Sequence, residues 1–189
     1  MLSKHKSIRN LALMALLCMA FSGAANAQNP TASGVINANL VNKNGISIQF
    51  DTNSSGVTLG AAGTSAATAN FGAVSAFGPL SGGVTRPSVT AANYTVRTIF
   101  DVQVVQGGLA SLTYTLTANL AAAAPIGLSY KVDAVTLSTA SQTIQTNGGY
   151  NTDIAHNLDL VVSTAAPGAG GPAVGTPITT VINFTATAN

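Results

Sequence analysis

Apolar and polar residues alternate one by one along several segments of the chain, and this two-residue period is typical of a half-buried β-strand. Residues 94–104 and 112–120 show it most plainly. The inward faces predicted for these two segments consist of Tyr94, Val96, Thr98, Phe100, Val102 and Val104, and of Leu112, Tyr114, Leu116, Ala118 and Leu120. Shorter runs cover residues 46–50, 128–134, 158–162 and 178–187. Because each strand must bury its apolar face against a second sheet, we expect an all-β fold, an antiparallel β-sandwich.

The last run and the connecting segments complete this prediction. The inward face of the closing strand is expected to carry Ile178, Ile182, Phe184 and Ala186. Glycine, proline and asparagine separate the runs, as at residues 147–149, where a turn is expected. Residues 60–70 are predicted to be a loop or a weak edge strand, and residues 167–177 a long loop. No repeat of fixed period is visible, and a single domain is expected.

Residues 1–27 have the parts of an export signal. Basic residues precede an apolar stretch from Leu11 to Phe21, which is shorter than the roughly 20 residues that a membrane-spanning helix needs. Small residues at Ala25 and Ala27 then suit a cut after Ala27. We therefore expect a cleaved, helical signal peptide over residues 1–27 and one β-sandwich domain over residues 28–189. The expected location is the periplasm, the cell surface or the extracellular space.

Removal of the signal peptide changes the charge of the chain. Residues 28–189 keep four basic side chains and five aspartates, a net charge of −1 with histidine neutral. A basic face for nucleic acid is not expected, nor a stable membrane span after cleavage. The single cysteine, Cys18, leaves with the signal peptide, so no disulfide is expected. A surface that is polar but barely charged suits a subunit packed among neighbours.

Few residues of the expected domain could carry chemistry. His156 is its only histidine, with Asp153 three residues before it and Asp159 three residues after it. This spacing does not by itself align a base with an orienting carboxylate, and no G-x-S-x-G motif is present. A transition-metal site needs several histidine or cysteine ligands. We therefore predict no catalytic residue, no metal site and no enzyme activity, with His156 in a loop or at a strand edge.

Residues Asp51–Gly56 place oxygen-bearing side chains at the first, third and fifth positions before a glycine, as calcium loops do. The twelfth position, where a calcium loop has glutamate, is Ala62. An ordinary Asx-type turn after the strand expected at residues 46–50 is favoured over calcium binding. No cofactor is expected.

Three further features carry a resemblance: the extended segment Gly34–Val41, the segment Asn70–Val74, and a predicted strand at the C-terminus. With them the chain resembles bacterial pilin-type, fimbrial subunit-like secreted β-sandwich proteins. The resemblance implies an incomplete immunoglobulin-like sandwich that a neighbour's N-terminal segment completes by β-strand addition. The candidate donor-strand segment that it implies is Val35, Ile36, Asn37, Ala38, Asn39, Leu40 and Val41. Either alternating set of these residues could enter the groove, and the alternative is that Gly34–Val41 is the first strand of its own sandwich.

These observations lead us to expect a secreted or surface structural subunit, fimbrial or pilin-like, that belongs to a fimbrium, a coat or another surface layer. Its partners would be copies of itself or related subunits, together with a periplasmic chaperone. The alternative is a stand-alone adhesin-like module that binds a glycan or a host surface. Such a module predicts a concave patch rimmed by tyrosines, and the tyrosines available are Tyr94, Tyr114, Tyr130 and Tyr150.

Overall fold

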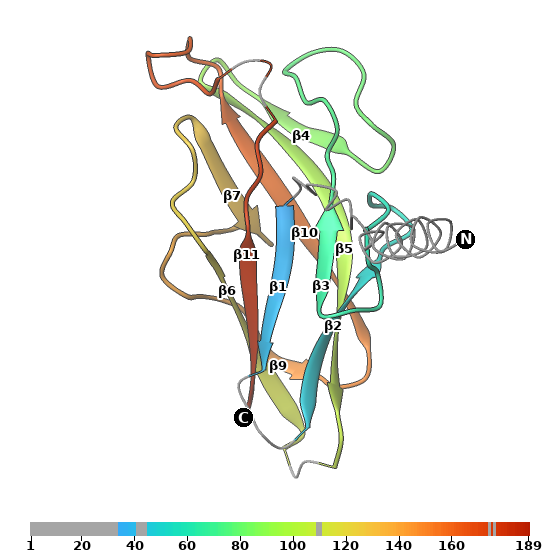
Figure 1. Ribbon diagram of the computed structural model, residues 1–189. Helices are drawn as coiled ribbons and strands as arrows, with labels where there is room; N and C mark the ends of the chain where they lie inside the picture. The colour runs from blue at the N-terminus through green and yellow to red at the C-terminus, as the bar shows by residue number, and fades with distance from the viewer. Residues whose placement is uncertain (1–33, 41–44, 109–110, 174, 176) are drawn as a thin grey trace, which may run out of the picture. The chain divides into compact units, whose positions relative to one another are not determined.

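The computed structural model describes residues 34–40, 45–108, 111–173, 175 and 177–189 (Figure 1). Within these ranges the chain forms eleven strands and no helix. The strands are β1 (Gly34–Leu40), β2 (Ile46–Thr52), β3 (Ala66–Ala69), β4 (Thr85–Val89), β5 (Asn93–Gln106), β6 (Thr113–Leu120), β7 (Leu128–Val132), β8 (Val135–Thr136), β9 (Gln142–Gly149), β10 (Asp153–Ser163) and β11 (Ile182–Ala188). Accordingly, the described ranges hold no helix long and apolar enough to cross a membrane. The expected signal peptide, residues 1–27, lies outside them.

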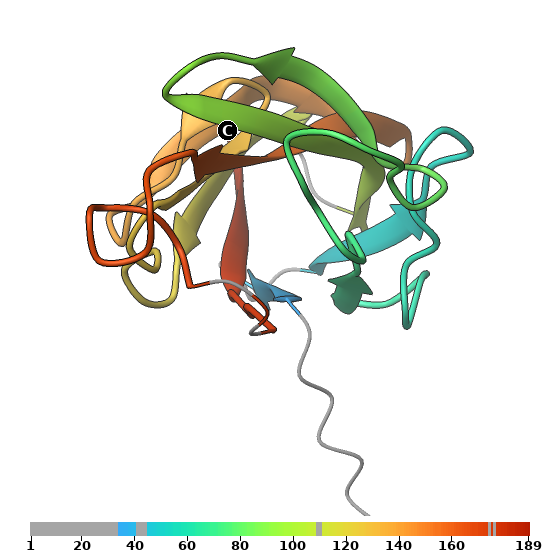
Figure 2. The same cartoon turned by 90° about the horizontal axis from the view of Figure 1, so that it is seen from above.

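The strands form two sheets on opposite sides of one core (Figures 1 and 2). The first sheet has the order β3-β1-β11-β6-β9, and the second has the order β2-β5-β10-β7-β8. The long strand β5 pairs with β2 along its second half and with β4 along its first half. The expected all-β fold with antiparallel sheets is thus confirmed, and the arrangement is consistent with a β-sandwich.

Strand β5 shows why the two-residue pattern was informative. Every second residue from Tyr94 to Val104 is buried, and the residues between them are half-buried. Its neighbour β10 lies antiparallel in a register that places Phe100 beside His156 and Tyr94 beside Val162. All six residues predicted to face inward from this strand are buried.

Three phenylalanines join the two sheets at the centre of the core. Phe50 of β2 and Phe100 of β5 belong to the second sheet, Phe184 of β11 belongs to the first, and all three are fully buried. The Phe184 ring meets the Phe50 ring edge-on at a centroid distance of 5.3 Å and the Phe100 ring at 5.8 Å. Edge-to-face contact at such distances is the arrangement that aromatic rings prefer.

Some expected strand boundaries were wrong. Leu112 was expected to face inward, but β6 begins at Thr113 and the Leu112 side chain is 86% exposed. Ile178 precedes β11 and is 41% exposed. Residues 128–134 were expected as one strand, whereas Asp133 and Ala134 adopt positive φ and form the turn between β7 and β8. Alternation alone does not reveal where the partner strand ends.

The sequence predicted one edge strand of the first sheet, β3, better than the other, β9. β3 falls within residues 60–70, where a loop or weak edge strand was expected. β9 was missed. Residues 147–149, where a turn was expected, are the last three residues of this strand, and the turn follows at residues 150–152. Its exposure does not alternate regularly, and its pairing with β6 contains register shifts. An edge strand of this kind buries little, so its sequence carries no strict two-residue pattern.

One pair of strands is parallel, whereas antiparallel pairing was expected. β1 runs parallel to β11, whereas every other pair of described strands is antiparallel. The first described strand and the last are joined by no hairpin. No tight turn therefore forces them to run in opposite directions.

Candidate functional site

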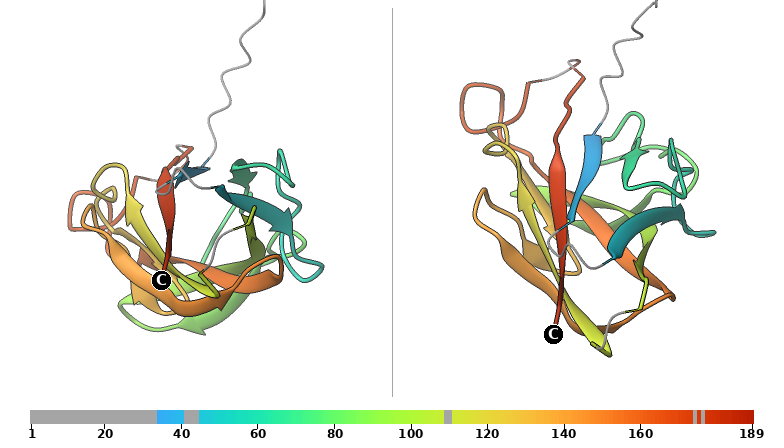
Figure 3. Two further views of the ribbon diagram at one scale, coloured as in Figure 1. Left: turned by 90° about the horizontal axis from the view of Figure 1, so that it is seen from below. Right: turned by 60° about the horizontal axis from the view of Figure 1, so that its bottom comes forward.

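Strand β1 occupies the position in the first sheet between β11 and β3 (Figure 3, right). Its backbone pairs with β11 over Ile36–Leu40 and with β3 over Gly34–Asn37. Within this chain, then, the candidate donor segment pairs with the chain's own sheet. Val41, the last residue of that segment, lies outside the described residues.

The register of β1 distinguishes the two alternating sets that the sequence left open. Ile36 is paired with Ile182, Ala38 with Phe184, and Leu40 with Ala186, and these three β11 side chains are all buried. Asn37 and Asn39 are paired with the half-buried Asn183 and Thr185. The set Ile36, Ala38 and Leu40 is therefore the one in register with the core face of β11.

The pairing of β11 also depends on β1. One edge of β11 is bonded to β6 and the other to β1, so β11 is a central strand only while β1 is in place. The four-residue strand β3 joins the sheet through β1. A vacated β1 position would leave an edge of β11 with unpaired N–H and C=O groups, which is a template for another strand.

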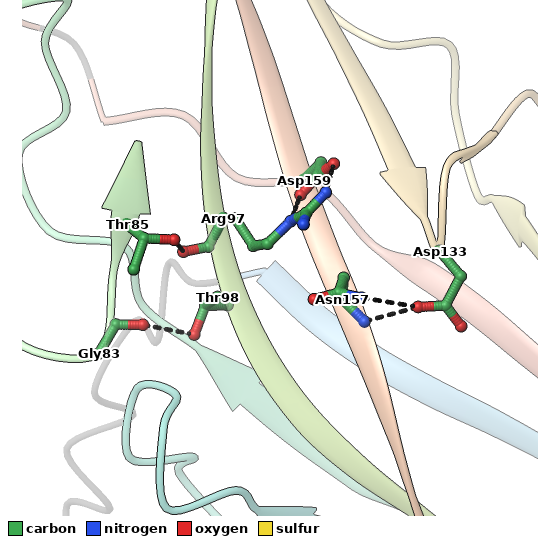
Figure 4. Close-up of polar contacts among 7 residues, drawn as sticks. All are labelled: Gly83, Thr85, Arg97, Thr98, Asp133, Asn157 and Asp159. Atoms are coloured by element: carbon green, nitrogen blue, oxygen red, sulfur yellow. Dashed lines mark hydrogen bonds and ion pairs between the residues drawn. The ribbon is translucent and has the colours of Figure 1, made fainter. Parts of the chain in front are cut away.

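His156, the only candidate base, is held by a residue that sequence reasoning missed. Its Nδ1 lies 2.5 Å from Oδ2 of Asp133, while Oδ1 of Asp133 accepts a hydrogen bond from the backbone N–H of Asn157 at 2.7 Å (Figure 4 shows the Asn157 contact). The turn after β7 brings Asp133 to β10 from 23 residues away. The sequence neighbours Asp153 and Asp159 do not bond to His156.

The His156 ring is enclosed. Its side chain is 3% exposed, and its ring centroid lies 6.0 Å from that of Phe100. Among the described residues Nε2 has no hydrogen-bond partner, so no hydroxyl is in place for activation there. The expected loop or strand-edge histidine is wrong, because the side chain points from β10 into the core. Its contact with Asp133 ties the β7–β8 turn to β10.

The two aspartates beside His156 in the sequence have other partners. Asp159 is buried and accepts two hydrogen bonds from Arg97, at 2.6 Å from Nε and 2.8 Å from Nη2 (Figure 4). The two residues face each other across β5 and β10. The Asp159 hydrogen bond raises the pKa of Arg97, outweighing the opposing effect of burial. Asp153 accepts a hydrogen bond from Gln103 at 3.0 Å.

The calcium-like segment forms the turn that was expected, and this prediction is confirmed. Oδ1 of Asn53 accepts a hydrogen bond from the backbone N–H of Ser55 at 2.9 Å, and the backbone oxygen of Asn53 accepts one from Gly56 at 3.0 Å. The Asn53 amide also donates to Asp101 at 2.7 Å. Across the part of the chain that the structure describes, no three histidine, cysteine or acidic residues gather in a way that could hold a metal ion.

Three of the four tyrosines that the binding-module alternative placed at a surface patch do not lie at the surface, and the fourth, Tyr150, is half-buried against the core. Tyr94, Tyr114 and Tyr130 are buried in the core and are 8%, 0% and 7% exposed. Burial raises the pKa of Tyr114 to about 12, with a smaller contribution from Tyr150. These rings contribute to packing and cannot rim a glycan site.

The lowered pKa of Asp133 predicts how the stability of the fold changes at acid pH. Burial raises the pKa of Asp133, but the hydrogen bonds from His156 and Asn157 outweigh it, and the net pKa lies below the ordinary 3.8. A depressed carboxyl pKa adds stability that is complete above the unfolded-state pKa and is lost as the pH falls through the folded-state pKa. We expect the free energy of unfolding to decline below about pH 4, and to decline less steeply in Asp133→Asn. Urea titrations at a series of pH values measure both slopes, and equal slopes would contradict this assignment.

Comparison with known proteins found no match to this chain. No family model, no curated protein and no solved structure matches it. Its function is therefore inferred from the pairing, burial and charge of its own residues.

Proposed function

We propose that the protein is an exported structural subunit of the bacterial surface, pilin-like, with an immunoglobulin-like sandwich that assembles by β-strand addition. In this proposal the segment Gly34–Leu40 leaves its own sheet and enters the same position in a neighbouring copy. The observation that carries it is the place of β1 between β11 and β3. A strand added there is paired along both edges, which gives strand addition its affinity.

The position of β1 in the chain supports exchange. β1 precedes every other described strand, and its only strand partners are β11 and β3. It can leave the sheet without breaking any pairing of the second sheet. The hydrogen bonds lost in one copy are regained in the next, as in exchange of identical elements between protomers.

The charge of the chain favours close packing of copies. Residues 28–189 carry a net charge of −1, so little long-range repulsion opposes association. The segment Gly34–Leu40 contains no charged residue. Its residues Ile36, Ala38 and Leu40 are in register with the buried face of β11, so apolar residues would align with the core of the receiving subunit.

Deletion of Gly34–Leu40 tests the proposal. We expect the wild-type chain to form concentration-dependent polymers that survive dilution, and the deleted chain to form none. A synthetic peptide of residues 34–40 should bind the deleted chain and stabilise it as a monomer, whereas a peptide of the same composition in scrambled order should not. Electron microscopy and thermal unfolding give the readouts. Polymers of the deleted chain, or a wild-type chain that stays monomeric at all concentrations, would refute strand exchange.

A further inference from the structure

β3 belongs to a strap, residues 60–70, that links the β2 edge of the second sheet to β1 in the first (Figure 1). The strap begins after Leu59, which is buried, and ends before Phe71, which is partly buried against the core. Between these two anchors every residue except Ala67 is exposed or half-buried. A segment with so few buried apolar groups opens at a lower free energy than the core strands do.

Backbone hydrogen bonds hold the strap to β2. The Phe50 N–H donates to the backbone oxygen of Thr64 at 3.0 Å, and the Gly63 N–H donates to that of Phe50 at 2.8 Å. Within the strap, Gly60 and Thr68 exchange two backbone hydrogen bonds, both of 2.9 Å, which close it into a hairpin. The strap therefore presents β3 to β1 as a preformed edge.

The strap covers the edge of β1 that faces away from β11. β3 pairs antiparallel with residues Gly34–Asn37, the first half of β1. The opposite edge of β1 is bonded to β11. β1 cannot leave the sheet until its pairing with β3 is broken. With the strap open, β1 would be an edge strand held by β11 alone.

We propose that the strap is a clasp, which opens before β1 leaves the sheet and closes over the strand that replaces it. This inference rests on the strand exchange proposed above. The pairing of β3 with β1 is present before exchange and is restored with a neighbour's β1 afterwards, so it cancels in the equilibrium. It is absent at the barrier between the two states. The clasp therefore sets the rate of exchange and leaves its final extent unchanged.

Thr64→Val loosens the clasp. The Thr64 hydroxyl lies 2.6 Å from the backbone oxygen of Ala61 and 2.7 Å from that of Ala66, and it accepts a hydrogen bond from the Ala66 N–H at 3.3 Å. Valine has nearly the same shape and makes none of these bonds. We expect the full-length variant to polymerise about tenfold faster than the wild-type chain and to the same final extent. Light scattering measures the rate, and sedimentation measures the final extent.

Thr90→Val is the matched control. The Thr90 hydroxyl also bonds to the backbone of a turn, since it accepts from the Asn93 N–H at 3.0 Å and donates to the Asn93 oxygen at 2.9 Å. This turn joins β4 to β5 in the second sheet and pairs with no part of β1. We expect Thr90→Val to polymerise at the wild-type rate.

A disulfide that keeps the clasp closed should have the opposite effect. A Cβ atom at Gly60 would lie 3.4 Å from the Cβ atom of Thr68, close to the roughly 3.5–4.5 Å found in disulfides. Gly60 does not have positive φ, so a cysteine fits its backbone. Cys18, the only cysteine of the chain, lies in the expected signal peptide. We expect the oxidised Gly60→Cys/Thr68→Cys chain to polymerise at least about tenfold more slowly than the same chain after reduction.

The results distinguish the clasp from strand exchange itself. Chains that polymerise at one rate, whether wild-type, Thr64→Val or oxidised double variant, would overturn the clasp and leave strand exchange intact. Equal acceleration in Thr90→Val, or a change in final extent instead of rate, would also overturn the clasp. No polymer of any chain would refute strand exchange and the clasp with it. Thermal unfolding must show each variant folded, and if Thr64→Val does not fold, the oxidised and reduced forms of the double variant decide.

Discussion

Replacing Gly56 with alanine is expected to lower the free energy of unfolding by at least about 3 kcal/mol. A Cβ atom at Gly56 would lie 1.8 Å from the backbone oxygen of Ile99, in the middle of β5. Backbone cannot rotate away as a side chain can, so either β5 or the loop after β2 must move. Movement there would also disturb Thr98, whose buried hydroxyl accepts a hydrogen bond from Val57 at 2.9 Å and donates one to Gly83 at 3.0 Å (Figure 4 shows the Gly83 contact).

The matched control is Gly82→Ala. A Cβ atom at Gly82 has no heavy atom within 4 Å, and neither Gly82 nor Gly56 has positive φ. The two substitutions therefore differ in steric contact and not in backbone strain. We expect Gly82→Ala to change the free energy of unfolding by no more than about 0.5 kcal/mol. Urea denaturation compares both variants with the wild-type chain, and similar midpoints for the two would show that the close approach at Gly56 is absent.

The residues that face the core could largely be predicted because burial in a strand is a local property. In β5 the whole predicted inward set is buried, and in β6 the set fails only at Leu112, which precedes the strand. The pattern identifies which face of a strand is apolar. It does not identify the neighbouring strand, and for that reason the parallel pairing of β1 with β11 was not anticipated.

The polar contacts could not be predicted because they depend on register and on turns. Arg97 and Asp159 are 62 residues apart and meet because β5 and β10 place them opposite each other. Asp133 reaches His156 because the chain turns at Asp133 and Ala134. The available signal was an aspartate between two short apolar runs, which favours a two-residue turn. Proximity in sequence pointed instead to Asp153 and Asp159, neither of which bonds to His156.

The second large effect is expected from Phe184→Ala, at about 3–5 kcal/mol of unfolding free energy. Phe184 is fully buried, and its ring contacts those of Phe50 and Phe100 from the opposite sheet. Truncation removes these contacts and leaves a cavity that the paired strands cannot close. Leu112→Ala removes a side chain that is 86% exposed and should cost no more than about 0.5 kcal/mol.

The same substitution distinguishes two contributions to the binding of β1, namely apolar contact with the core and backbone pairing with β11. Phe184 is in register with Ala38, but the hydrogen bonds between β1 and β11 are made by the backbone and do not require its ring. Phe184→Ala should therefore weaken binding of the 34–40 peptide to the deleted chain only by the part of the binding free energy that comes from apolar contact with the core. Peptide titrations of the deleted chain with and without Phe184→Ala measure that share. Unchanged peptide affinity would assign the binding free energy to backbone pairing alone, while a loss of about tenfold or more would assign a substantial part of it to apolar contact.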